Sequence, residues 1–121
     1  MVKDRLLEKK SVDFAVKIVQ FYKCLCEEKR EYVLAKQVLK SGTSIGANIR
    51  ESRNAQSKAD FMNKLNVALK EADETQYWFE VLEKSEIINP EDFEMLNKDL
   101  SELIAILVSS IKTLKNNLKS K

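Results

Sequence analysis

Histidine is absent from this chain of 121 residues, and glycine, proline and cysteine are scarce, with two, one and two residues respectively. The lack of histidine removes the commonest zinc ligand, the Glu-x-x-His pairs of di-iron helical bundles and the usual general base of enzymes. The sequence also shows no glycine-rich phosphate loop after a strand and no nucleophile–base pair. It therefore predicts a protein that is not an enzyme and that holds no cofactor.

A metal site built from carboxylates alone is the remaining catalytic possibility. The acidic residues that helical spacing places near a core are Glu51, Asp60, Glu71 and Glu74. Zinc and other transition metals usually need imidazole or thiolate ligands as well, so this set is a poor match. We therefore predict no bound metal.

The scarcity of turn-forming residues predicts a chain that is helical almost throughout. The β-branched residues are scattered among Leu, Lys, Glu and Ala, which also favours helices. Hydrophobic residues make up 44% of the chain and charged residues 33%, a balance typical of one folded domain with a charged surface. No apolar run approaches the roughly 20 residues that span a bilayer. The first residues lack the apolar core of a signal peptide, so the expected location is the cytoplasm.

Apolar residues recur at spacings of three and four along four segments, which is the pattern of amphipathic helices. Ser11 is expected to cap the first helix, and Asn89-Pro90 to begin the last, because these residue types favour those positions. We predict helices over about residues 11–30, 32–55, 58–86 and 90–118. Four long helices with short connections predict an all-α, antiparallel, up-down-up-down four-helix bundle in a single domain.

Both glycines of the chain, Gly42 and Gly46, lie within the second predicted helix and on one face of it. Because each weakens an isolated helix by about 1 kcal/mol relative to alanine, close packing against a neighbouring helix is expected there. A loop over residues 41–44 between two short helices is the alternative. The apolar repeat keeps its phase across the glycines, which favours one continuous helix.

Basic residues gather on the same predicted helix. Lys36, Lys40 and Arg50 fall opposite the apolar stripe, and Arg53 lies at the edge of that face. Residues 32–56 carry these four against one acid, whereas residues 57–89 carry seven acids against four lysines. Repeated in an oligomer, the face would suit a nucleic-acid backbone. An ordinary solvated surface explains it equally well, and the net charge of +2 is small.

Two further features concern packing. Asn48 falls on the core side of the second predicted helix, where a hydrogen bond to a facing side chain is expected and a ligand contact is the alternative. Apolar residues also exceed what one core requires, which predicts a homo-oligomer. These extra residues are Met62, Leu69, Tyr77, Trp78, Ile104, Val108 and Ile111.

The segments Ser41–Glu51, Asp60-Phe61, Lys70-Glu71-Ala72 and Glu74–Trp78 resemble a known family. It is the four-helix-bundle family named for proteins encoded in intervening sequences of bacterial 23S rRNA genes. The Ser-Ile-x-x-Asn-Ile-x-Glu core is specific, and the resemblance covers nearly the whole chain. The chain is also similar to the accessory protein of diversity-generating retroelements, a basic pentameric bundle that binds RNA and a reverse transcriptase.

The resemblance implies a left-handed bundle that assembles into a ring, typically a pentamer, with no catalytic residues. Asn48, Glu51 and Glu74 match family positions and are expected to be structural. The implied partners are further copies of the chain and RNA or a nucleic-acid-processing protein, with no membrane. A protein-interaction scaffold that binds no nucleic acid is the alternative function.

Overall fold

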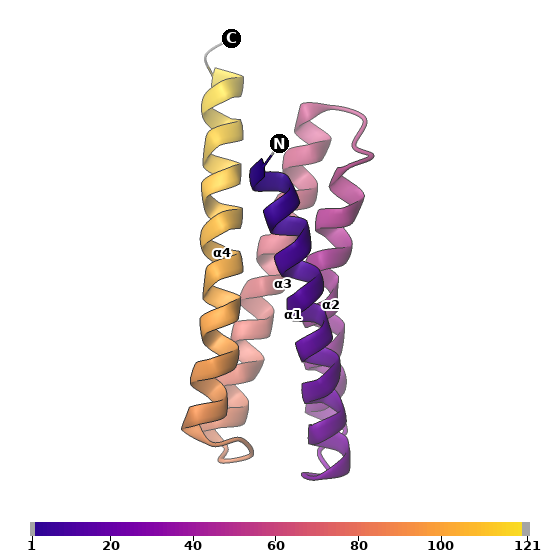
Figure 1. The fold of residues 1–121 in the computed structure, drawn as a ribbon, viewed down its shortest axis with the longest axis vertical. Helices are drawn as coiled ribbons and strands as arrows, with labels where there is room; N and C mark the ends of the chain where they lie inside the picture. Colours follow the sequence, from indigo (N-terminus) through magenta and orange to yellow (C-terminus); the bar gives the residue numbers. More distant parts are fainter. Residues whose placement is uncertain (1, 120–121) are drawn as a thin grey trace.

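The computed structural model describes the backbone of residues 2–119 and the side chains of residues 5–117. Four helices follow one another along the chain: α1 (Val2–Glu27), α2 (Val33–Ser52), α3 (Lys58–Lys84) and α4 (Pro90–Lys119). Each helix lies beside the next, and α4 also lies beside α1 (Figure 1). The predicted all-α, single-domain, up-down four-helix bundle is confirmed.

The first helix begins at Val2, so the predicted start at Ser11 is wrong. The buried Ser11 hydroxyl donates a hydrogen bond to the Glu8 carbonyl oxygen at 2.8 Å. A serine that bonds back to its own helix satisfies its hydroxyl there and does not need to end the helix. Leu7, which is 2% exposed, continues the apolar stripe before Ser11 and packs the additional turns onto the core.

The later helix starts follow local capping signals. The Ser57 hydroxyl oxygen accepts a hydrogen bond from the Asp60 backbone N–H at 3.0 Å, so Ser57 caps α3. At the start of α4, the Asn89 side-chain oxygen accepts from the Asp92 N–H at 2.8 Å, with Pro90 in the first helical position. Both caps supply partners for N–H groups that the helix itself leaves unpaired.

The second helix runs unbroken through residues 41–44, so the prediction of one continuous helix is confirmed and the loop alternative is wrong. The chain is helical at both glycines, neither of which has a positive φ. In the core between the helices, the Phe79 ring meets Phe14 and Phe21 edge-on, at centroid distances of 6.5 and 6.0 Å. Within the described residues, no helix is apolar over enough length to cross a membrane.

Candidate nucleic-acid interface

The two glycines bring α2 close to α1. A Cβ on Gly42 would lie 2.9 Å from two side-chain carbons of Ile18, and a Cβ on Gly46 would lie 3.2 Å from the Ser11 hydroxyl oxygen. The face of α2 that carries these glycines is therefore filled by α1. Buried residues of α2 also contact α3, which leaves one outer face of the helix exposed.

The predicted basic residues lie on or beside this outer face. Lys36, Lys40, Arg50 and Arg53 all have exposed side chains. Helical geometry places the first three on one face, with only the small side chains Thr43 and Ala47 between the lysines and Arg50. From Lys36 to Arg53 the helix rises about 25 Å. We call these four residues the basic face.

Glu8 of α1 pairs with the arginine end of the basic face. Its Oε1 atom lies 2.6 Å from Arg53 Nε and 3.5 Å from Arg50 Nε. The same oxygen accepts no hydrogen bond from the described groups, so both contacts are ion pairs without well-directed N–H donation. The arginine side chains remain 59% and 57% exposed. One carboxylate therefore offsets two guanidinium groups that still face solvent.

The lysine end differs, because no carboxylate of the described residues lies within ion-pair distance of Lys36 or Lys40. Lys40 does interact electrostatically with Glu71 on α3, which is half-buried. Loss of hydration raises the pKa of Glu71, and the negative charge of Glu74 raises it further, whereas Lys40 and Lys70 lower it. Lys36 and Lys40 thus have no close counter-charge of the kind that Glu8 provides to the arginines.

The expected hydrogen bond from Asn48 to a facing side chain is wrong. The half-buried Asn48 amide instead donates to the Ser44 carbonyl oxygen, one turn back in α2, at 2.8 Å. The buried polar link between α2 and α3 is made by the hydroxyls of Ser41 and Thr75, which are 2.9 Å apart. Both residues are wholly buried, so this pair makes the buried polar contact between helices that was expected of Asn48.

Glu51 and Glu74, the acidic residues that match the family motif, lie on the surface. Glu51 pairs with Lys64 of α3 at 3.6 Å. Glu74 accepts a hydrogen bond from the indole N–H of Trp78 at 3.2 Å. Within the described residues, no three Cys, Asp or Glu side chains are grouped so that they could hold a metal ion.

Sequence reasoning missed Glu8 and the Ser41–Thr75 pair for different reasons. A helix predicted to start at residue 11 leaves Glu8 outside α1, although the apolar stripe extended back to Leu7 would have placed it inside. Ser41 and Thr75 each fall on the apolar repeat of their own helix. Which two small polar residues of a stripe face each other depends on the register between helices, and no sequence signal fixes that.

These features define a small four-helix-bundle protein with a basic outer face on one helix. Residues 3–109 match the family model described as 23S rRNA-intervening sequence protein, and the chain belongs to that family. The fold is similar to the crystal structure of a protein of unknown function from the S23 ribosomal protein family of Bacteroides thetaiotaomicron, with a TM-score of 0.90 and 55% identity. The match covers 91% of this chain and 98% of that one. No curated protein matches this chain.

Proposed function

We propose that the protein is a non-enzymatic homo-oligomer, a pentameric ring as the family resemblance implies, that binds RNA phosphates through its basic face. The observation that carries the proposal is the exposure of Lys36, Lys40 and Arg50 along one side of α2, with small residues between them. A phosphate backbone can approach such a surface closely. Lysine and arginine contacts to phosphate need no particular base sequence.

The charge arrangement supports this proposal. Lys36 and Lys40 have no ion-pair partner among the described residues, and Arg50 and Arg53 share the single carboxylate of Glu8. The basic face therefore keeps an excess of positive charge. Repetition around a ring multiplies the number of phosphates that one RNA can contact, and linked contacts bind more tightly than single ones.

Two separate apolar grooves support self-association. One lies between α1 and α2, is lined by Val12, Val16, Val19, Gly46 and Ala47, and also includes Arg50 of the basic face. A second copy seated there leaves Lys36 and Lys40, which do not line this groove, as the part of the basic face open to RNA. The other lies between α3 and α4 and includes Leu69, Val108 and Ile111. Val16 is 52% exposed and Val108 47%, so each groove presents an apolar side chain to solvent. Because the grooves occupy different sides of the bundle, contact of one with the other is heterologous and can close a ring.

The solution mass tests the assembly. We expect the wild-type protein to run as a multimer by light scattering, and Val16→Glu to lower the mass, because a charge would enter an apolar contact. Val33→Glu is the matched control, since Val33 is 72% exposed and lines neither groove. A wild-type mass equal to one chain would refute the ring.

RNA binding is tested by fluorescence anisotropy with a single-stranded RNA of mixed sequence, titrated across a range of NaCl concentrations. Replacing both Lys36 and Lys40 by alanine removes two phosphate contacts, so the logarithmic salt dependence should become shallower by about 1.4. Lys84→Ala with Lys98→Ala, two exposed lysines elsewhere, is the control. An affinity that does not change between low and moderate salt rules out phosphate contacts.

A protein-interaction scaffold is the second candidate function, favoured by the partial neutralisation of Arg50 and Arg53 by Glu8. In that case the ring presents its helices to a partner protein and binds no RNA. Recovery of one protein in fixed stoichiometry, with no absorbance of nucleic acid at 260 nm in the untreated complex, would support the scaffold over RNA binding.

A further inference from the structure

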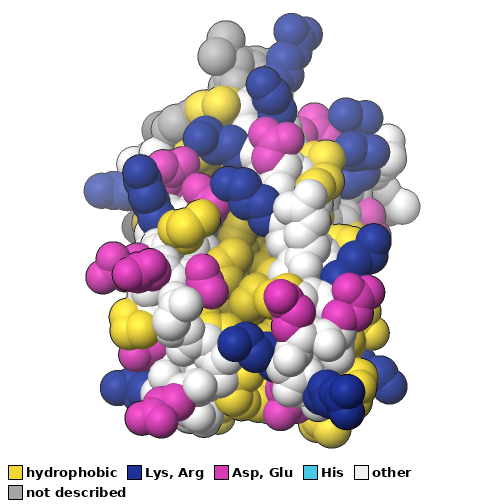
Figure 2. Space-filling model, turned by 60° about the horizontal axis from the view of Figure 1, so that its bottom comes forward, with side chains coloured by type: hydrophobic (Ala, Val, Ile, Leu, Met, Phe, Trp, Pro, Cys, Tyr) yellow, Lys and Arg dark blue, Asp and Glu magenta, His cyan; other side chains and the backbone are white. Residues whose placement is uncertain are grey.

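A groove between α1 and α4 has no part in the function proposed above. Its floor is apolar and is made by Phe21 and Leu25 of α1, Leu96 of α4 and Ile88 of the connection before α4. α1 and α4 approach each other less closely than the other neighbouring helices. Figure 2 shows an apolar strip between two ridges that carry charged side chains. This side of the bundle is therefore incompletely closed.

The two rims of the groove carry opposite charge. On the α1 side stand Lys10 and Lys17, followed by Lys29 in the next connection, with Asp13 as the one acid. On the α4 side stand Asp92, Asp99 and Glu102. The pattern is thus mainly basic along one edge and wholly acidic along the other.

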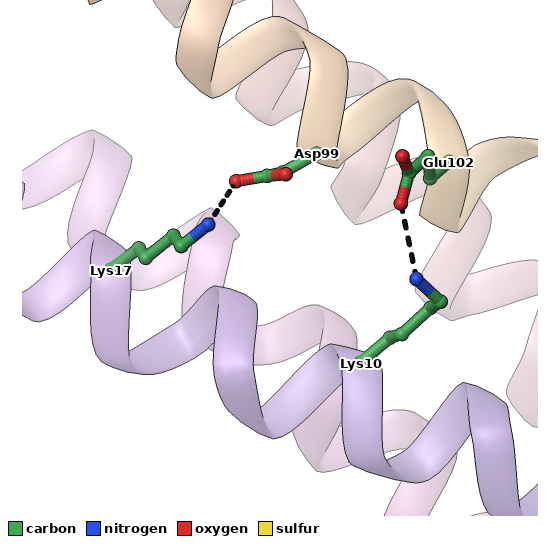
Figure 3. A network of polar contacts seen from close by, with 4 residues as sticks. All are labelled: Lys10, Lys17, Asp99 and Glu102. Atoms are coloured by element: carbon green, nitrogen blue, oxygen red, sulfur yellow. Dashed lines mark hydrogen bonds and ion pairs between the residues drawn. The ribbon is translucent and has the colours of Figure 1, made fainter.

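Two ion pairs cross the groove (Figure 3). Lys17 Nζ lies 2.5 Å from an Asp99 carboxylate oxygen, and Lys10 Nζ lies 3.1 Å from a Glu102 oxygen. The hydrogen bond from Lys17 to Asp99 is the main cause of the raised pKa of Lys17. Between 32% and 54% of each of these side chains is exposed. Such exposed pairs contribute little to stability, so their members can exchange partners when another chain enters.

The dimensions suit a helix. From Asp92 to Glu102 the α4 rim extends about 15 Å, which is close to three helical turns. Met95 stands beside the floor with 69% of its surface exposed, and its flexible side chain can adapt to an apolar partner. Charged side chains cross the apolar strip, so a docked helix has to displace the ion pairs of Lys10 and Lys17.

We propose that this groove docks an amphipathic helix of another protein, with an apolar stripe on the floor, acidic residues along one edge and basic residues along the other. The acidic edge would face Lys10, Lys17 and Lys29, and the basic edge would face the carboxylates of α4. The acidic rim repels RNA phosphates, so nucleic acid is a poor occupant. Further copies of the chain have the two apolar grooves described above. The proposal therefore does not depend on RNA binding by the basic face.

The test uses the full chain and three fluorescent synthetic helical peptides of 18 residues with the same leucine stripe. One peptide carries glutamates on one edge and lysines on the other, one carries glutamates on both edges, and one carries lysines on both. We expect the mixed peptide to bind at least about tenfold more tightly than either of the others, because each of those meets one rim of like charge.

Variants then locate the binding site. Met95→Glu should weaken the mixed peptide about tenfold, whereas Val33→Glu, an equally exposed apolar position outside the groove, should not. Asp99→Lys should reduce the difference in affinity between the mixed peptide and the peptide with glutamates on both edges, although Asp92 and Glu102 keep part of the α4 rim acidic. Equal affinity for all three peptides, or no effect of Met95→Glu, overturns the proposal. A lower solution mass for Met95→Glu also overturns it, because a second copy would then fill the groove.

Discussion

Gly42 of α2 faces Ile18 of α1 so closely that any side chain on residue 42 would overlap the isoleucine. A Cβ there would lie 2.9 Å from both branches of the Ile18 side chain, and Ile18 is wholly buried. Ile18 therefore has little room to move away. This one contact explains why a residue that weakens helices stands in the middle of α2.

Gly42→Ala should accordingly destabilise the protein, although alanine is the better helix former. The helical preference favours alanine by about 1 kcal/mol, but overpacking of a buried isoleucine costs about 1–3 kcal/mol. We expect a net loss, measured by urea unfolding. Gly46→Ala is the comparison, because its Cβ would meet the Ser11 hydroxyl at 3.2 Å and should cost less. A Gly42→Ala variant more stable than wild type would show that the helices separate readily.

The sequence was sufficient to predict the four helices and the continuity of α2, because the spacing of apolar residues reports directly on helical faces. It also indicated which face of α2 carries exposed cations. It could not indicate their partners. Whether Glu8 meets Arg50 and Arg53 depends on the axial register of α1 against α2, which small contacts such as that of Gly46 with Ser11 determine.

The hydrogen-bond partner of Asn48 was also not predictable from the apolar repeat. The repeat placed it on the core side, and burial of an amide normally demands a partner on the facing helix. The side chain is only half-buried and bonds within its own helix. A shift of a few tens of degrees around the helix separates these outcomes, and a periodicity of 3.6 residues does not resolve it.

Removal of the Glu8 carboxylate should increase RNA affinity. Glu8→Gln leaves Arg50 and Arg53 without their shared counter-charge, so both can pair with phosphate. We expect a gain of about 1 kcal/mol at low salt, close to fivefold in Kd, and a steeper salt dependence. Glu102→Gln, which removes the partner of Lys10 on another side of the bundle, is the control. A lower or unchanged affinity for Glu8→Gln would separate the arginines from RNA binding.

The half-buried carboxyl of Glu71 should make stability depend on pH. Loss of hydration raises its pKa in the folded protein, so the folded state binds a proton more readily than the unfolded state. Stability contributed by this group therefore decreases as pH rises from its ordinary pKa of about 4.5 through the raised folded value, and stays low above it. Glu71→Gln should raise the Tm at neutral pH and remove that part of the decrease. Identical pH profiles for the two proteins would contradict the assignment.

The buried hydroxyl pair between α2 and α3 should show energetic coupling. Thr75 lies 2.9 Å from the Ser41 hydroxyl, and its own hydroxyl also lies 2.8 Å from the Glu71 carbonyl oxygen. Thr75→Val leaves Ser41 without its partner on the facing helix, so we expect a loss of about 1–2 kcal/mol in the free energy of unfolding. Ser41→Ala should cost about 1 kcal/mol for the same reason.

The double variant Ser41→Ala with Thr75→Val should cost less than the sum of the single changes, by about 0.5–1 kcal/mol, because the second change then removes a group that is already unpaired. Urea unfolding of all four proteins measures this difference. Thr113→Val combined with Ser41→Ala is the control pair, since the Thr113 hydroxyl bonds within α4 to the Ser109 carbonyl oxygen. Additive costs for Ser41 and Thr75 would mean that each hydroxyl is satisfied within its own helix, and that the link between α2 and α3 rests on apolar packing alone.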